Sequence, residues 1–123
     1  MMRRWLASLL ISLLLLGATG MILHWTVNQQ EKVATTVTLS QQSNNKTWFF
    51  YRDDCPDCQT IYHQVYWHNF IHHDVVFINL NNQANRQYIQ SQGLTAVPTF
   101  INGEARYTGT NREQIDSILA QSN

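Results

Sequence analysis

A charge-free apolar run at residues 5–23 (WLASLLISLLLLGATGMIL) constrains this chain most. As a helix it spans about 29 Å at about 1.5 Å per residue, close to the hydrocarbon thickness of roughly 30 Å. Trp5 and Trp25 bracket the run as interfacial aromatics do, and Arg3 and Arg4 precede it. The run therefore predicts a single transmembrane helix whose basic N-terminus stays in the cytoplasm.

This run also divides the chain. We expect an N-terminal signal anchor over residues 1–25, a polar tether over 26–34, and one folded domain over 35–123. A cleaved signal peptide is the alternative, with the small residues at 18–20 (ATG) as a poor cleavage site because apolar residues follow them. Either way we expect the domain outside the cytoplasm, anchored to the cell membrane or secreted after cleavage.

The charge after the apolar run excludes one large class of function. Residues 26–123 carry six Lys and Arg side chains against eight Asp and Glu. A nucleic-acid binder needs a basic face, so no nucleic-acid partner is expected. The two cysteines, Cys55 and Cys58, are too close together to staple a fold.

Hydrophobic periodicity and turn signals predict an α/β domain with a central mixed sheet flanked by helices. Asn85 is the expected N-cap of the second domain helix, Asn102-Gly103 a two-residue hairpin turn, and Thr110-Asn111-Arg112-Glu113 a capping box. The expected strands cover residues 33–39, 47–51, 75–80, 99–101 and 104–108, the expected helices begin at residues 56, 85 and 110, and a loop covers 40–46.

The sequence Cys55-Pro56-Asp57-Cys58 stands where a strand gives way to a helix. Proline is favoured at the first helical position, which makes Cys55 the cap residue and places Cys58 in the first turn. The Cys55 sulfur then meets unpaired backbone N–H groups and the positive end of the helix dipole, and both favour a thiolate, the nucleophilic form. The three-residue separation also lets the two sulfurs form a disulfide without backbone movement.

Two other readings of the cysteine pair stay open. Half of a zinc site has the same C-x-x-C spacing, but a structural zinc ion needs four ligands, and His63 does not share the helix face of Cys58. His68 and His72 are spaced to share a surface metal, yet two ligands are too few for zinc, so no metal or cofactor is predicted. A purely structural disulfide would close a very small loop and constrain the chain little.

The part of the chain from residue 33 or 47 to the end resembles the thioredoxin-like superfamily. The matching segments are TWFFY at 47–51, C-P-D-C at 55–58, V-P-T at 97–99 and the hairpin P-T-F-I-N-G at 98–103. The resemblance implies a thioredoxin-like fold. The transmembrane helix that precedes it makes the layout similar to bacterial extracytoplasmic thiol-disulfide proteins, which implies a single-pass location in a bacterial cell membrane. The resemblance also implies thiol-disulfide exchange on protein or peptide substrates, with a redox partner that the sequence does not identify.

The resemblance assigns roles to individual residues. Cys55 is the nucleophile and Cys58 resolves the mixed disulfide. Pro98 follows a cis peptide bond in that family, and the backbone of Val97 binds the substrate chain. The chain departs from thioredoxins proper in having Asp54 where they have Trp before the first cysteine. It also has Pro56-Asp57 between the cysteines in place of Gly-Pro, and Phe49 where they bury an acid.

Acidic residues near the thiols bear on the direction of exchange. Asp53, Asp54 and Asp57 oppose thiolate formation at Cys55, while the helix N-terminus favours it. We therefore expect a reductase or isomerase rather than a strong oxidase, with Asp53 and Asp54 as tuning residues. A non-enzymatic docking module in an export system and a Cys/His copper carrier are the alternative functions.

Overall fold

A computed structural model describes residues 2–40 and 45–122 and divides into two compact units, one ending at Gln30 and one beginning at Glu31. The loop expected over residues 40–46 lies largely outside the described residues. The elements in chain order are α1 (Met2–Glu31), β1 (Thr47–Tyr51), α2 (Pro56–His72), β2 (Val75–Asn79), η2 (Gln83–Arg86), α3 (Gln87–Ser91), β3 (Thr99–Asn102), β4 (Ala105–Thr108), α4 (Arg112–Leu119) and η3 (Ala120–Ser122).

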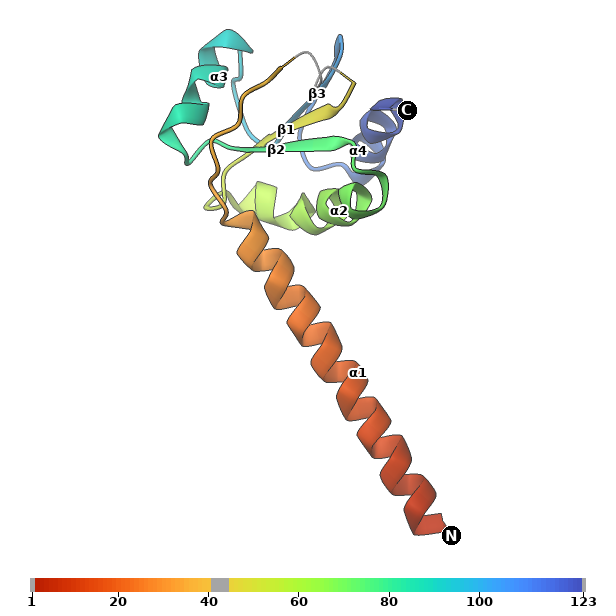
Figure 1. Cartoon of the computed structure of the whole chain (residues 1–123). Helices are drawn as coiled ribbons and strands as arrows, with labels where there is room; N and C mark the ends of the chain where they lie inside the picture. Colours follow the sequence, from red (N-terminus) through yellow and green to blue (C-terminus); the bar gives the residue numbers. More distant parts are fainter. Residues whose placement is uncertain (1, 41–44, 123) are drawn as a thin grey trace. The chain divides into compact units, whose positions relative to one another are not determined.

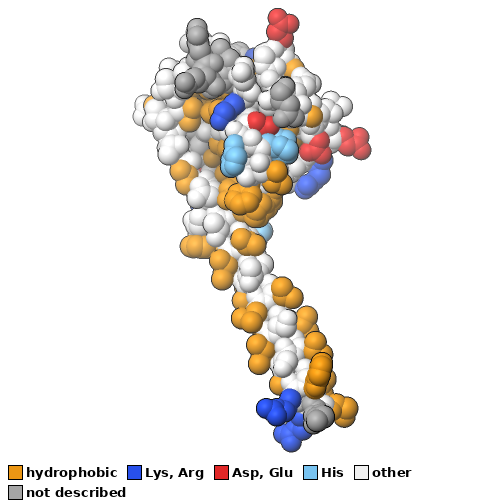
Figure 2. All heavy atoms as spheres, turned by 45° about the vertical axis from the view of Figure 1, so that its right-hand side comes forward, with side chains coloured by type: hydrophobic (Ala, Val, Ile, Leu, Met, Phe, Trp, Pro, Cys, Tyr) orange, Lys and Arg blue, Asp and Glu red, His pale blue; other side chains and the backbone are white. Residues whose placement is uncertain are grey.

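The first unit is formed by helix α1 up to Gln30, and α1 is long and apolar enough to cross a membrane. Hydrophobic side chains cover its surface along most of its length, and its basic side chains gather at its start (Figure 2). A signal sequence has the same length and composition, so α1 is a candidate for either role.

The second unit is built on a four-stranded mixed sheet with the order β2-β1-β3-β4 (Figure 1). Strand β1 pairs in parallel with β2 and antiparallel with β3, and β3 pairs antiparallel with β4. Helix α2 lies on one face of the sheet and α3 on the other (Figure 1). The predicted mixed sheet flanked by helices is therefore confirmed.

An aromatic row runs across the sheet face that α2 covers. Phe49 pairs with Phe77 on β2 and with Phe100 on β3, and Phe100 pairs with Tyr107 on β4. The ring centroid of Phe49 lies 4.8 Å from that of Phe100 and 5.5 Å from that of Phe77. Phe49 and Phe100 are fully buried, so this row forms the centre of the core on that face.

The segment 33–39 is not the predicted strand. It runs extended over the face that carries Phe50, and Val37 and Leu39 pack there against the buried cluster. Side chains take the place of a strand ladder, because Val37 N–H donates to Asn85 Oδ1 at 2.9 Å and Leu39 N–H to the Tyr88 hydroxyl at 3.1 Å. The β-branched alternation of this segment reflects half-burial rather than strand pairing.

Three predicted local signals are displaced by one or a few residues. The helical segment after β2 begins with Asn82, whose side chain accepts from Ala84 N–H, and not with Asn85, which is fully buried. The hairpin has Gly103 (φ +58°) and Glu104 as its two loop residues, because Asn102 still pairs with Ala105. Helix α4 is capped by Asn111 rather than by Thr110.

Replacing Asn85 by alanine tests the side-chain anchoring of the 33–39 segment. The Asn85 amide accepts from Val37 N–H and donates to the carbonyls of Thr35 and Asn79. Loss of these bonds leaves partly buried backbone groups without partners, so the free energy of unfolding should fall by about 2–3 kcal/mol. Urea denaturation of the detergent-solubilised chain measures it, with exposed Gln90→Ala as control. Equal midpoints for both variants would contradict the prediction.

Candidate active site

Cys55 caps the N-terminus of α2. Its backbone is extended (φ −93°, ψ 117°), Pro56 follows as the first helical residue, and its sulfur accepts from the Cys58 backbone N–H at 3.3 Å. This is the ordinary capping bond, made by sulfur in place of a hydroxyl or carboxylate oxygen. The expected arrangement of a cysteine at the positive end of a helix is therefore present.

The two thiols differ in their surroundings. Both are free, Cys55 is partly exposed, and Cys58 is fully buried. Burial raises the pKa of the Cys58 thiol, and its hydrogen bond to the Cys55 sulfur acts in the same direction. Cys58 is thus held as a neutral thiol that donates to Cys55, which adds a second donor to the one from the backbone.

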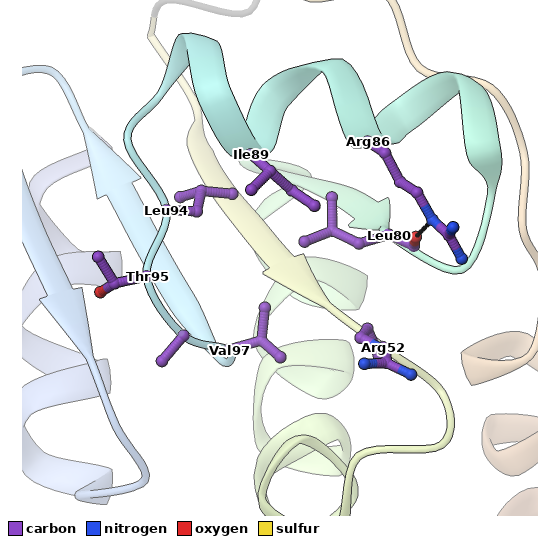
Figure 3. A pocket seen from close by; sticks show the side chains of 8 residues that line it. Arg52, Leu80, Arg86, Ile89, Leu94, Thr95 and Val97 are labelled. Carbon is purple, nitrogen blue, oxygen red and sulfur yellow. Dashed lines mark hydrogen bonds between the residues drawn. The ribbon is translucent and has the colours of Figure 1, made fainter.

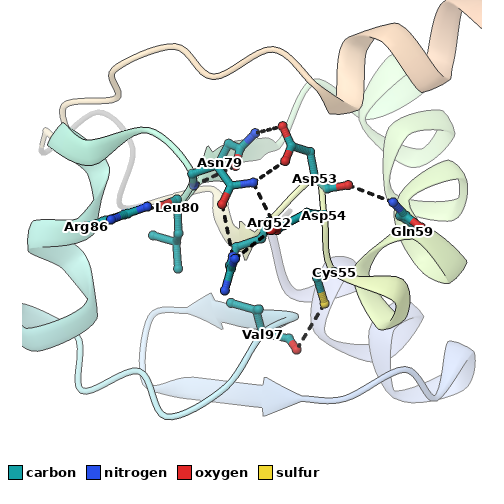
Figure 4. A network of polar contacts seen from close by, with 10 residues as sticks. Arg52, Asp53, Asp54, Cys55, Gln59, Asn79, Leu80, Arg86 and Val97 are labelled. Carbon is teal, nitrogen blue, oxygen red and sulfur yellow. Dashed lines mark hydrogen bonds and ion pairs between the residues drawn. The ribbon is translucent and has the colours of Figure 1, made fainter.

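The loop before β3 faces the cysteine pair. The Val97–Pro98 peptide bond is cis, as the resemblance implied, and Pro98 is buried. The Cys55 sulfur lies 3.9 Å from the Val97 carbonyl oxygen (Figure 4). Residues from α2 and from the loop before β3, about forty positions apart along the chain, thus flank one sulfur atom. Substrate binding by Val97 and Pro98 stays a prediction.

The acidic residues before Cys55 belong to a polar network (Figure 4). Arg52 forms an ion pair with Asp54 at 2.8 Å and donates to Asn81 at 3.1 Å. The Asn81 amide donates to both Asp53 and Asp54, and Asn79 donates to Asp53 at 3.3 Å. The hydrogen bond from Asn81, followed by the contacts with Arg52, lowers the pKa of the exposed Asp54 carboxyl.

This network partly offsets the charges that we expected to oppose thiolate formation. Asp53 and Asp54 are satisfied by an arginine and two amides, whereas Asp57 lies exposed in the first turn of α2. Asn79 and Asn81 were not among the predicted site residues. The sequence holds a signal for them, because they lie at the end of the expected strand 75–80, and polar residues at the carboxyl ends of parallel strands gather at one edge of a sheet.

A cavity of about 390 Å³ lies beside Val97 (Figure 3). Leu80, Ile89, Leu94 and Val97 form its apolar lining, and the side chains of Arg52 and Arg86 lie toward one end of it (Figure 3). Arg86 is held in place by a bond from its Nε to the Leu80 carbonyl at 3.0 Å. Val97 is shared by the cavity and the cysteine site.

The histidines do not complete a metal site with the cysteines. Within residues 2–40 and 45–122, no three His, Cys, Asp or Glu side chains come together in a way that would hold a metal ion. His68 and His72 stack with ring centroids 4.5 Å apart, and His68 also pairs with Asp74 at 3.1 Å. A copper carrier that uses the cysteine pair and a histidine is not supported by this geometry.

Comparison with known proteins agrees with the geometry at the level of the fold. No family model matches the chain, and no curated protein matches it. Among solved structures, the X-ray structure of Fasciola hepatica thioredoxin matches with a TM-score of 0.53 and 21% identity, over 64% of this chain and 85% of that thioredoxin. This chain has a thioredoxin-like fold. Its long apolar helix α1 precedes that fold as a candidate membrane span.

The contrast between the thiols predicts unequal alkylation in the reduced protein. Cys55 is partly exposed and accepts two hydrogen bonds, whereas burial and a raised pKa keep Cys58 protonated at neutral pH. Because each pKa unit lowers the thiolate fraction tenfold, iodoacetamide should modify Cys58 at least about 100-fold more slowly than Cys55.

Mass spectrometry of the Cys55→Ser and Cys58→Ser variants gives the two rates separately. The Cys58 rate should rise only at pH values above the ordinary thiol range. Equal rates at neutral pH would show that the two sulfurs are not differentiated.

Proposed function

We propose that this chain catalyses thiol-disulfide exchange on protein or peptide substrates outside the cytoplasm. The thioredoxin-like fold supports exchange in general. The observation that carries the proposal is the Cys55 sulfur, which is partly exposed, caps α2, accepts from Cys58, and lies 3.9 Å from the Val97 carbonyl oxygen.

The proposed cycle passes two electrons from the cysteine pair to a substrate disulfide. The Cys55 thiolate attacks one substrate sulfur, and the other substrate sulfur leaves as a thiolate. Cys58 then attacks Cys55, the mixed disulfide breaks, and the second substrate sulfur leaves with the electron pair. The pair ends as a Cys55–Cys58 disulfide, and a reductant of unidentified kind must reopen it.

Substrate contacts are proposed on both sides of Val97. Its backbone would hold an extended substrate segment beside Cys55, next to Pro98. An apolar side chain of that segment would enter the cavity lined by Leu80, Ile89 and Leu94. Partly unfolded polypeptides offer extended, apolar segments of this kind, which favours protein over small-molecule substrates.

The compartment is also part of the proposal. The charge-free run in α1 is preceded by Arg3 and Arg4, and such a bias keeps the N-terminus in the cytoplasm. With the expected anchor over residues 1–25, tether over 26–34 and redox domain over 35–123, the thiols would lie outside a bacterial cell membrane, where oxidants maintain disulfides.

Trapping tests the proposed exchange directly. In Cys58→Ala the resolving sulfur is missing, so substrates should stay covalently bound to Cys55 and appear as reducible adducts on non-reducing gels. The matched control is Cys55→Ser combined with Cys58→Ala, which should form none. Absence of adducts in Cys58→Ala, with Cys55 still reactive toward iodoacetamide, would favour a docking module over an enzyme.

The reduction potential tests the proposed direction. Asp57, exposed in the first turn of α2, carries a charge that opposes thiolate formation, even though Arg52 and two amides contact Asp53 and Asp54. We therefore expect a value nearer ~−250 mV than ~−120 mV. Equilibration with dithiothreitol or glutathione buffers, followed by counting free thiols, measures this potential. A value near ~−120 mV would instead identify the chain as an oxidase.

A further inference from the structure

Cys58 needs a proton acceptor if it is to act as proposed. It is fully buried, its thiol is neutral, and only a thiolate attacks a disulfide efficiently. Solvent does not reach the sulfur, so the acceptor has to be a group within the protein. Phe49 is buried in β1 at the position where thioredoxins proper have an acid, and its aromatic ring accepts no proton.

Glu31, the first residue of the second unit, is a buried acid with an unexplained side chain. Its exposed fraction is 7%, and its Oε1 atom is buried with no hydrogen-bond partner among the described residues. Leaving a carboxylate oxygen buried and unpaired costs free energy, so such an atom calls for a functional explanation.

The surroundings of Glu31 fix its backbone and leave its carboxyl available. The Tyr51 hydroxyl donates to the Glu31 carbonyl at 3.1 Å, and Asn79 Nδ2 donates to the same carbonyl at 3.4 Å. Tyr62 in turn donates to the Tyr51 hydroxyl. These contacts tie residue 31 to β1, to β2 and, through Tyr62, to α2, the helix that carries Cys58.

Burial is the first cause of the raised pKa of the Cys58 thiol, its hydrogen bond to Cys55 is the second, and the charge of the Glu31 carboxylate is the smallest of the causes. The two groups therefore lie within electrostatic range of each other. When the proton moves from Cys58 to Glu31, the carboxylate becomes a neutral acid and the thiol becomes a thiolate. The two groups are then not negative at the same time, so the transfer avoids repulsion between a carboxylate and a thiolate. Asp53 is the other nearby carboxyl, but its oxygens already accept from Asn79 and Asn81.

We propose that the Glu31 carboxylate takes the proton from the Cys58 thiol when Cys58 attacks the mixed disulfide on Cys55. This inference rests on the proposed exchange function. In the step, the Cys58 S–H bond breaks and its proton passes to Glu31, directly or through one water. The Cys58–Cys55 bond forms, the Cys55–substrate bond breaks, and the electron pair leaves on the substrate sulfur. Glu31 then releases the proton to solvent or to that departing thiolate.

Neighbouring ionisable groups affect the protonation of Glu31 and Cys58. Burial raises the pKa of the Tyr51 and Tyr62 hydroxyls, so both stay neutral throughout the range in which thiols exchange. Glu31 therefore titrates beside one cation and one further carboxyl. The titratable and charged groups around it are Lys32 on the adjoining residue, Asp53 before α2, Tyr51 on β1, and Cys58 and Tyr62 on α2.

The experiment separates the attack by Cys55 from the attack by Cys58. The reduced full chain in detergent is mixed with excess 2,2′-dipyridyl disulfide, and release of thiopyridone is followed by stopped flow. Attack by Cys55 releases the first thiopyridone, and attack by Cys58 releases the second. The Cys58→Ala variant identifies the phases, because it should show the first release only.

Glu31→Gln should slow the second phase about 100-fold at neutral pH and leave the first unchanged, as loss of a general base does. The deficit should shrink as pH rises, because hydroxide then deprotonates Cys58 without help. Glu31→Asp keeps the carboxylate and should be intermediate, and exposed Glu104→Gln is the matched control. The inference would be overturned if the second phase of Glu31→Gln had the wild-type rate, or if its rate were lowered by the same factor at every pH.

Two further results of this experiment would also be decisive. If Glu31→Gln does not fold, the wild-type and Glu31→Asp pH profiles decide: the second phase should fall at low pH as the carboxyl is protonated, and a profile that follows thiol ionisation alone would overturn the inference. If wild type releases no second thiopyridone, the proposed exchange function itself fails, which is a different result from a normal wild type with an unaltered Glu31→Gln.

Discussion

Three strand ends meet at one edge of the sheet, and the proposed chemistry depends on that meeting. Because β1 pairs in parallel with β2 and antiparallel with β3, the end of β1, the end of β2 and the start of β3 fall together. The first leads into Cys55, the second carries Asn79, and the third is preceded by Val97. A sulfur, a polar network and the loop that carries the cis Val97–Pro98 bond are thus brought together by backbone pairing.

The aromatic row explains why the site departs from thioredoxins proper. Phe49 stacks on Phe100 and packs edge-on against Phe77, so an aromatic ring in an apolar environment fills that position of the central strand. The row strengthens the core where the family places an ionisable group. Glu31, a buried carboxyl at the end of α1, lies within the segment 26–34 that we expected to be the tether, and its backbone carbonyl is bonded to Tyr51 and Asn79. A role once held by a strand residue has moved to a different segment in this interpretation.

Much of the fold could be predicted from local patterns, because those patterns have short-range causes. Pro56 after a dense strand predicts a helix start, and α2 begins there. The cysteine at the cap follows from the same residue. Asn85 shows where local rules fail, since an asparagine before apolar residues has the pattern of a helix cap, but this one is buried and bonded to residues about fifty positions away. Glu31 could not be assigned for the same reason, because its neighbours come from β1, β2 and α2.

Strand β2 is an edge strand of apolar composition, and its two ends are closed by amide side chains. Asn69 Oδ1 accepts from the Val75 N–H at 2.9 Å, and Asn85 Nδ2 donates to the Asn79 carbonyl at 3.0 Å. Both backbone groups point away from β1, into the direction from which a foreign strand would add. The two amides occupy backbone groups that an incoming strand would otherwise pair with. They therefore protect this five-residue apolar edge strand from edge-to-edge aggregation.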